Sequence, residues 1–171
     1  DCAAWAQAAQ SPQATAPALY AAALSAHRLG QAASALALAA RGRSGASVAT
    51  RSAWDLLQLE ILLGPGAKGL NDLQRTALRD QALAGGSRAE LLLGAQAALA
   101  TQGNLPVVAS RLQQWLAGQP GDAQAWQTLS RVQAAMGQRL RSVRSEAESR
   151  AAQLDFAGAA DRFRAAQMLP V

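Results

Sequence analysis

The chain has 171 residues, half of them apolar, and a formal charge of +5. This length suits one domain with a real core, and no apolar run approaches the eighteen or more residues that a membrane-spanning helix needs. Alanine and leucine dominate the apolar half, whereas aromatic and β-branched residues are few, which favours close-packed helices over strands. We therefore expect a soluble, all-α, single-domain protein without a transmembrane segment.

The positive charge is carried almost entirely by arginine, since Lys68 is the only lysine. The arginines are scattered, and two have helical partners four residues away, Arg144 with Glu148 and Arg150 with Glu146. A solvated helix surface accounts for this pattern, so we expect no nucleic-acid partner. A basic nucleic-acid binder, the alternative, would show an affinity that falls steeply with salt.

The chain begins with Asp-Cys-Ala-Ala-Trp, which lacks the basic start and long apolar middle of a signal peptide. So abrupt a start suggests a piece excised from a longer protein. Residues 2–10 fit the last turns of a helix that ends at Ser11 and Pro12, with Trp5 packing on the next helix. The only cysteine, Cys2, excludes an internal disulfide and has no cysteine or histidine at metal-ligand spacing.

Two helices, residues 15–29 and 31–41, are predicted on either side of Gly30. The first presents a small-residue face of Leu19, Ala22, Ala23 and Ala26, which allows the close approach of an antiparallel hairpin.

Glycine-containing stretches flank the next helix, which we predict from Ser47 or Thr50 to Gly64 with Trp54 in its buried stripe. We expect a hinge at residues 41–45. We also expect a flexible linker at residues 64–69, because four of these six residues are glycine or proline. A further helix over residues 71–84 is expected to bury Leu73, Ala77 and Leu78.

The second half of the chain repeats a helix-turn-helix with a period of 34 residues. Ser87 and Glu90 have the spacing of a capping box, and Asp122 is placed to cap a later helix. Leu92 and Trp126 are 34 residues apart, as are the turn glycines Gly103 and Gly137. This period, with two helices in each unit, is the tetratricopeptide (TPR) pattern.

The motif can be followed along this half of the chain. Residues 89–122 supply its characteristic positions as Leu92, Gly103, Val108, Leu112, Trp115 and Pro120, and the next unit supplies Trp126, Leu129 and Gly137. The register of the motif then slips by half a unit, because the next helix has the pattern of a second helix, with Ala159, Phe163, Ala166 and Pro170 at its characteristic positions. The helix over residues 139–153 is therefore expected to pack on both of its neighbours. We expect a TPR-like stack of nine or ten helices, degenerate over residues 1–86 and better matched over 87–171. An irregular alanine- and leucine-rich bundle is the alternative.

The run from Ala125 to Gln167 resembles the C-terminal repeat region of bacterial periplasmic zinc metallopeptidases of the β-barrel assembly-enhancing (BepA-like) type. The markers are Trp126 and Leu129, the Ala147 to Ala151 segment, and Asp155-Phe156 leading to a closing Ala-Ala-Gln. The resemblance implies a periplasmic, non-catalytic domain that docks on a catalytic domain, contacts the outer-membrane assembly machinery and positions substrates for quality control. A stand-alone TPR scaffold in envelope assembly or secretion is the alternative.

No catalytic, cofactor or metal site is expected within the chain. The family's H-E-x-x-H motif is absent, and His27 is the only histidine, so zinc is expected only in a separate catalytic domain. His27 has no acidic residue within a turn, as a Ser-His-Asp enzyme would require. Residues 64–69 do not satisfy the phosphate-loop pattern.

A peptide-binding surface is expected where first helices line the concave side of a TPR stack. On the first hairpin the predicted groove residues are Tyr20, Leu24, His27 and Arg28; on the best-matched unit they are Gln124, Gln127 and Arg131. Leu93 and Ala97 occupy these positions in the unit between. Arg28 and Arg131 are placed to anchor acidic groups or a C-terminal carboxylate. The alternative is that all of these are ordinary surface residues.

Trp54, Trp115, Trp126 and Phe163 are predicted as core residues instead. If Trp126 is buried, its replacement by alanine should cost about 3–5 kcal/mol.

Overall fold

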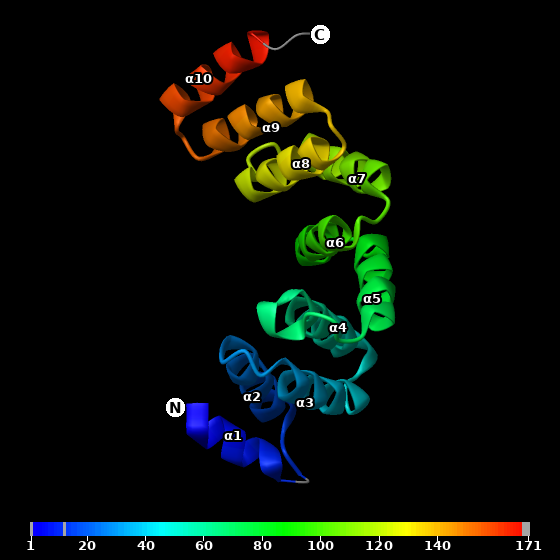
Figure 1. Cartoon of the computed structure of the whole chain (residues 1–171). Helices are drawn as coiled ribbons and strands as arrows, with labels where there is room; N and C mark the ends of the chain where they lie inside the picture. Colours follow the sequence, from blue (N-terminus) through cyan, green and yellow to red (C-terminus); the bar gives the residue numbers. More distant parts are fainter. Residues whose placement is uncertain (1, 12, 169–171) are drawn as a thin grey trace. The chain divides into compact units, whose positions relative to one another are not determined.

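The computed structural model describes residues 2–11 and 13–168, which contain ten α-helices, one short 3₁₀-helix and no strand (Figure 1). The predicted all-α class and its nine or ten helices are thus confirmed. The expected helix end at Pro12 and the closing Pro170 lie outside the described residues. None of the described helices has the length and apolarity to cross a membrane. The chain forms two compact units, residues 1–82 (unit 1) and 83–171 (unit 2).

Unit 1 is built from helices that pack on their neighbours in the sequence. Its helices are α1 (Cys2–Gln10), α2 (Ala16–Arg28), α3 (Ala32–Ser44), α4 (Val48–Leu63), the 3₁₀-helix η1 (Pro65–Ala67) and most of α5 (Asp72–Ala84). Alanines of α2 and α3 form the contact between these two helices, and Trp54 of α4 is 4% exposed in the same core. The Trp54 ring covers the backbone of Gly42, where an added Cβ would come within 2.2 Å of it. A glycine therefore lets the largest core side chain of unit 1 approach α3.

Three expectations about unit 1 are wrong. Helix α3 continues to Ser44, so residues 41–45 are mostly helix instead of a hinge. Residues 64–69 include η1, where Ala67 is fully buried, because this segment packs back on the first hairpin. Leu73 and Ala77, both expected in the core, are exposed, Leu73 to 88%, whereas Leu78 on the same helix is buried.

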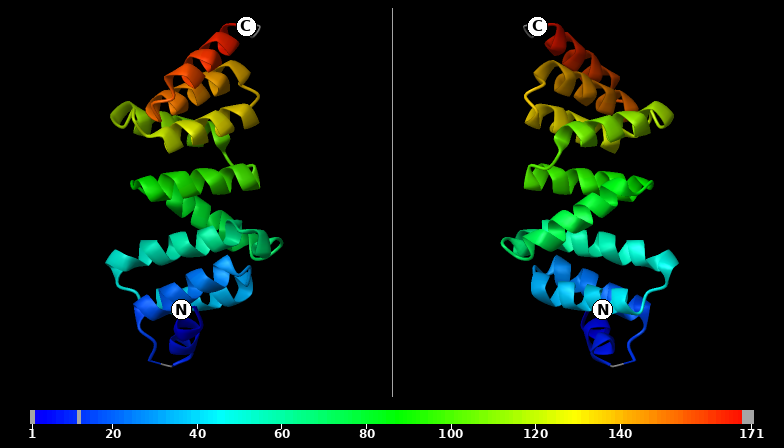
Figure 2. Two further views of the ribbon diagram at one scale, coloured as in Figure 1. Left: turned by 90° about the vertical axis from the view of Figure 1, so that its left-hand side faces the viewer. Right: turned by 90° about the vertical axis from the view of Figure 1, so that its right-hand side faces the viewer.

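The helices of unit 2 pack as a TPR-like stack. It contains α6 (Arg88–Thr101), α7 (Leu105–Gly118), α8 (Ala123–Ala135), α9 (Arg139–Ala152) and α10 (Phe156–Gln167). Helix α8 packs on both α6 and α7, which is how the first helix of one repeat contacts both helices of the repeat before it. Helix α9 packs on α8 and on α10, as predicted for a helix that serves both neighbours (Figure 2).

Side-chain caps mark every second helix of unit 2. Ser87 and Glu90 form the predicted capping box of α6, Asp122 accepts the Ala125 amide at the start of α8, and Asp155 accepts the Gly158 amide at the start of α10. The intervening helices α7 and α9 begin without a side-chain cap. Capped and uncapped helices therefore alternate along unit 2.

Four inter-helix turns of the described chain share one backbone geometry. Each contains a residue of positive φ, 73°, 50°, 75° and 66° in chain order: Gly30, Gln102, Gly137 and Leu154. The amide after each residue donates to the carbonyl five residues earlier, at 2.8–2.9 Å. This is the bonding of a Schellman turn, for which glycine is the favoured residue. Gln102 and Leu154 adopt it without glycine's freedom.

A series of serine hydroxyls joins α8 to α9. Ser130 lies against Ser142, the Ser145 hydroxyl donates to the Gln133 side chain at 2.8 Å, and the Ser149 hydroxyl donates to the Ala123 carbonyl at 2.8 Å. Ser145 and Ser149 are buried. We call these contacts the serine ladder; small hydroxyls in place of large apolar side chains hold these two helices together.

Candidate functional site

The predicted groove residues of unit 1 lie on α2, and the structure gives most of them packing contacts. Tyr20 is 40% exposed and stands edge-on against Trp54, with ring centroids 5.5 Å apart. Leu24 packs against the core, and the half-buried His27 ring lies over the Gly64 backbone. Arg28 is exposed. The first three therefore share one side of α2 and pack against other parts of unit 1.

The predicted residues of unit 2, Gln124, Gln127 and Arg131, are exposed on one side of α8. They belong to a different compact unit from the predicted residues of α2. Ala97, expected between them, is fully buried and cannot line an open surface, because it packs inside unit 2.

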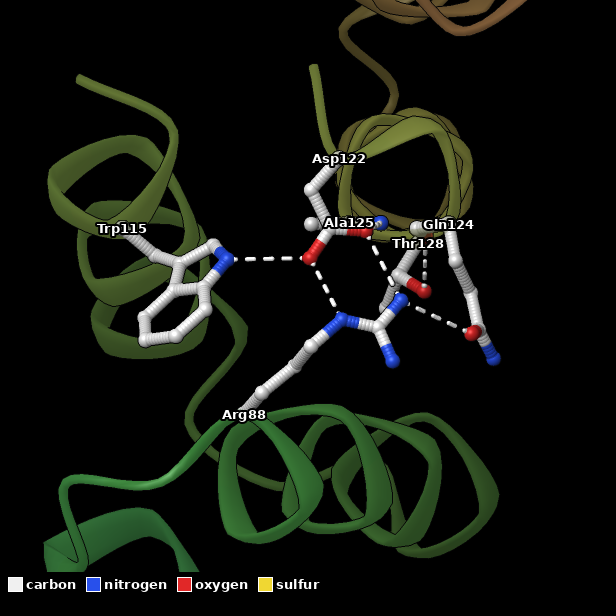
Figure 3. Close-up of polar contacts among 6 residues, drawn as sticks. All are labelled: Arg88, Trp115, Asp122, Gln124, Ala125 and Thr128. Atoms are coloured by element: carbon white, nitrogen blue, oxygen red, sulfur yellow. Dashed lines mark hydrogen bonds and ion pairs between the residues drawn. The ribbon is translucent and has the colours of Figure 1, made fainter. Parts of the chain in front are cut away.

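Asp122 joins three helices at the start of α8 (Figure 3). Its carboxylate accepts two hydrogen bonds from the Arg88 guanidinium, at 2.7 and 2.9 Å, one from the Trp115 indole at 3.0 Å, and the capping bond from Ala125. Arg88 also donates to the Gln124 side chain at 3.1 Å. The Arg88 guanidinium above all, helped by the other two donors, lowers the pKa of Asp122 to about 2.

This cluster is saturated with its own partners. The Asp122 side chain is 9% exposed, and its acceptor positions are occupied by donors from α6, α7 and α8. Because Arg88 is neutralised by Asp122, neither group is left to recognise a ligand. We therefore assign the cluster a structural role: it joins three consecutive helices of unit 2.

A cleft of about 560 Å³ opens on unit 2, and we call it the arginine cleft. Three successive helices line it: α7 with Gln113, Leu116 and Ala117, α8 with Trp126, Leu129 and Gln133, and α9 with Arg141, Arg144 and Ser145. Its volume lies within the range of about 300–1,000 Å³ that is common for ligand pockets. The cleft combines an apolar base with charged groups on one side.

The two arginines of the cleft have no carboxylate partner in the described part of the chain. Both are exposed, and Arg141 makes only a 3.4 Å contact with the Gln138 side chain. The predicted ion pair of Arg144 with Glu148 does not form, whereas that of Arg150 with Glu146 does, at 3.6 Å. Four other arginines of unit 2, Arg88, Arg150, Arg162 and Arg164, each contact an aspartate or glutamate, whereas Arg111, Arg131 and Arg139 make no such contact with a described residue. The cleft therefore has uncompensated positive charge.

Gln133 adds a hydrogen-bond donor to the cleft. Gln133 is 4% exposed, and its side-chain oxygen accepts the Ser145 hydroxyl, which leaves its amide nitrogen as the donor that it offers. No aspartate or glutamate lines the cleft. This composition suits a ligand that supplies acceptors and negative charge.

A hollow of about 410 Å³ on unit 1 has the opposite character. Its buried Asp55 is bonded by Arg43 and by the Gln81 side chain, the latter at 2.8 Å, and its Gln58 accepts from Gln74 at 2.7 Å. Since these groups satisfy one another, the hollow offers little to a partner. The arginine cleft is the better candidate site.

Sequence reasoning missed this site. Arg141 and Arg144 stand three residues apart and so share a helix face, but the same spacing is usual on solvated helices. The apolar base beside Arg141 and Arg144 becomes visible only when α7, α8 and α9 are packed together in the structure. No group of three or more His, Cys, Asp or Glu among the described residues is placed to hold a metal ion.

Comparison with known proteins assigns neither a family nor a function to the chain. The chain matches no protein-family model, and neither a curated protein nor a solved structure is significantly similar to it. The function of the chain therefore has to be argued from its own residues.

Proposed function

We propose that the chain is a protein-interaction module that holds a polypeptide partner and contributes binding instead of chemistry. The observation that carries this proposal is the arginine cleft, in which Arg141 and Arg144 stand without carboxylate partners beside the apolar Trp126, Leu116 and Leu129. An apolar base with a few polar groups at its edge is the usual build of a protein-interaction site. The TPR packing of unit 2 agrees with this role, because such repeats commonly present helix surfaces to other proteins.

The more specific proposal is that the chain is the non-catalytic C-terminal part of a periplasmic zinc metallopeptidase. In that setting it would position substrates and contact the outer-membrane protein assembly machinery. Its support is the resemblance of residues 125–167, described above. Zinc and the activated water would belong to a separate catalytic domain, where H-E-x-x-H supplies the ligands and the base.

The test is affinity capture with this chain as bait in a bacterial envelope extract, followed by identification of the retained proteins. The proposal expects retention of outer-membrane assembly components, reduced by Arg141→Ala/Arg144→Ala. Retention of other envelope proteins, with no H-E-x-x-H upstream in the intact gene product, would instead indicate a stand-alone adaptor. If the chain retains nothing, alone or as part of its intact gene product, the interaction proposal fails.

A further inference from the structure

The chemistry of the arginine cleft restricts what can occupy it. Arg141 and Arg144 are three residues apart on α9 and therefore present their guanidinium groups on one face of the helix. Each guanidinium can donate two parallel hydrogen bonds to a carboxylate, a geometry that lysine cannot reproduce. Two such groups side by side, with no acidic side chain lining the cleft, favour an occupant that carries more than one carboxylate.

The base of the cleft adds a second requirement. Leu116 and Leu129 are buried, and the half-buried Trp126 lies beside them, so the base is apolar and already part of the folded core. The Trp126 indole nitrogen donates to the Pro120 carbonyl at 2.9 Å, which fixes the ring in place. A large apolar side chain of the occupant would be removed from water there, which favours its binding.

We propose that the arginine cleft binds a peptide segment in which a large apolar side chain is flanked by aspartate or glutamate. The apolar side chain lies on Trp126 and the two leucines, and the flanking carboxylates accept hydrogen bonds from Arg141 and Arg144. Gln133 supplies a further donor from the wall of the cleft. This inference rests on the proposed function and names the chemistry of its partner.

The site differs from the groove expected from the sequence. That groove would use Arg131, which is exposed on α8 but does not line the cleft. Arg131 and Arg139, at the start of α9, therefore make a matched control pair: both are exposed arginines of the same unit, outside the cleft.

The experiment measures fluorescence anisotropy of labelled hexapeptides titrated with the whole chain. The probe is Asp-Glu-Leu-Phe-Asp-Glu with an amidated C-terminus, and the two control peptides are Asn-Gln-Leu-Phe-Asn-Gln and Asp-Glu-Ala-Ala-Asp-Glu, also amidated. The probe should bind at least about tenfold more tightly than either control, because each control lacks one of the two recognised features. Its affinity should also fall as salt is raised.

The variants then locate the site. Arg141→Ala/Arg144→Ala should weaken binding of the probe at least about tenfold and leave the weak binding of the asparagine-glutamine peptide unchanged. Arg131→Ala/Arg139→Ala should change it by less than about twofold. Circular dichroism and thermal unfolding of both variants check the fold, which is expected to persist because all four side chains are exposed.

Several outcomes would overturn the inference. They are no saturable binding of the probe, equal binding of the asparagine-glutamine peptide, or loss of binding only in the Arg131/Arg139 variant. A neutral peptide with a free C-terminal carboxylate is the last control; if it alone binds, the occupant is a chain terminus and the proposed segment is wrong. If the probe fails but the chain still captures envelope proteins, the interaction function stands and this site assignment falls; if capture fails too, both fall.

Discussion

Each unit has one aspartate that joins three helices, and the two aspartates do so differently. In unit 1, Asp55 lies in the interior of α4 and is bonded by side chains alone, from Arg43 on α3 and Gln81 on α5. In unit 2, Asp122 lies at the start of α8 and binds Arg88, Trp115 and the backbone amide of Ala125. Only the second aspartate also determines where a helix begins.

This difference extends through both units. None of α2, α3 and α4 begins with a side-chain cap, and unit 1 instead buries Trp54 and a row of alanines. In unit 2, the three helices α6, α8 and α10 begin with a side-chain cap. Unit 1 therefore depends on side-chain packing, whereas unit 2 depends to a larger degree on polar groups at helix ends.

The largest expected effect tests this dependence on packing. Trp54→Ala should lower the free energy of unfolding by about 3–5 kcal/mol, since it empties the largest core position of unit 1. Trp126→Ala should cost only about 1–2 kcal/mol, because Trp126 is half-buried, which corrects the value expected for a fully buried ring. Hydrogen exchange, followed separately in residues 1–82 and 83–171, measures both. Equal losses would remove the distinction between the two units.

The next effect tests the helix-end cluster. Asp122→Ala should destabilise unit 2 by about 2–3 kcal/mol, because the α8 cap, the Trp115 bond and the Arg88 ion pair are lost together. Asp55→Ala should cost about 1–2 kcal/mol, since its Arg43 partner is 42% exposed and can be rehydrated and no helix cap is lost. Urea denaturation of the two variants measures both losses in the free energy of unfolding. A larger loss for Asp55→Ala than for Asp122→Ala would contradict the prediction.

The contribution of Asp122 should also depend on pH. Its pKa is about 2 in the folded chain and about 3.8 when unperturbed, so the unfolded chain binds a proton first as the pH falls. About 2 kcal/mol of stability is therefore present above about pH 4 and is lost as the pH falls towards 2. Thermal unfolding of the wild type and Asp122→Asn should show a difference at pH 7 that shrinks at pH 2. If the difference between the wild type and Asp122→Asn were the same at both pH values, the stabilisation would not depend on the charge of the carboxylate.

The smallest effects concern the Schellman turns. Gly137→Ala should cost about 1 kcal/mol, because alanine is strained at a φ of 75°, whereas Leu154→Gly should stabilise the α9–α10 turn by about 0.5 kcal/mol. Leu154 is 75% exposed, so little packing is lost with its side chain. Chemical denaturation of both variants measures the two shifts. A destabilised Leu154→Gly would show that the leucine side chain stabilises the turn by a contact stronger than its exposure suggests.

The sequence predicts the helices well where local chemistry determines them. The capping box at Ser87 and Glu90, the cap at Asp122 and the turn at Gly137 are readable because each depends on residues only a few positions apart. The errors at residues 41–45 and 64–69 have a tertiary cause. Glycine usually ends helices, but Gly42 is required by the Trp54 ring, which no local pattern reveals.

The candidate site was harder to predict than the helices. Helix α9 buries Ser145, Ala147 and Ser149 instead of large apolar residues, so hydrophobic periodicity presents it as a surface helix. The sequence pattern therefore predicts that Arg141 and Arg144 lie on a solvated surface. Their role depends on the apolar side chains of α7 and α8 that α9 brings beside them, and such a meeting of three helices is absent from any single stretch of sequence.

The serine ladder has a consequence for recognition. A shift of α9 along α8 by one turn, about 5.4 Å, would break the bonds of Ser145 and Ser149 and leave buried hydroxyls unpaired, at about 1–3 kcal/mol each. A contact made of alanine and leucine alone has no such directional requirement. Arg141 and Arg144 are therefore carried on a helix whose register is fixed before any partner arrives, so association need not order the backbone beneath them, and more of the contact energy remains as affinity.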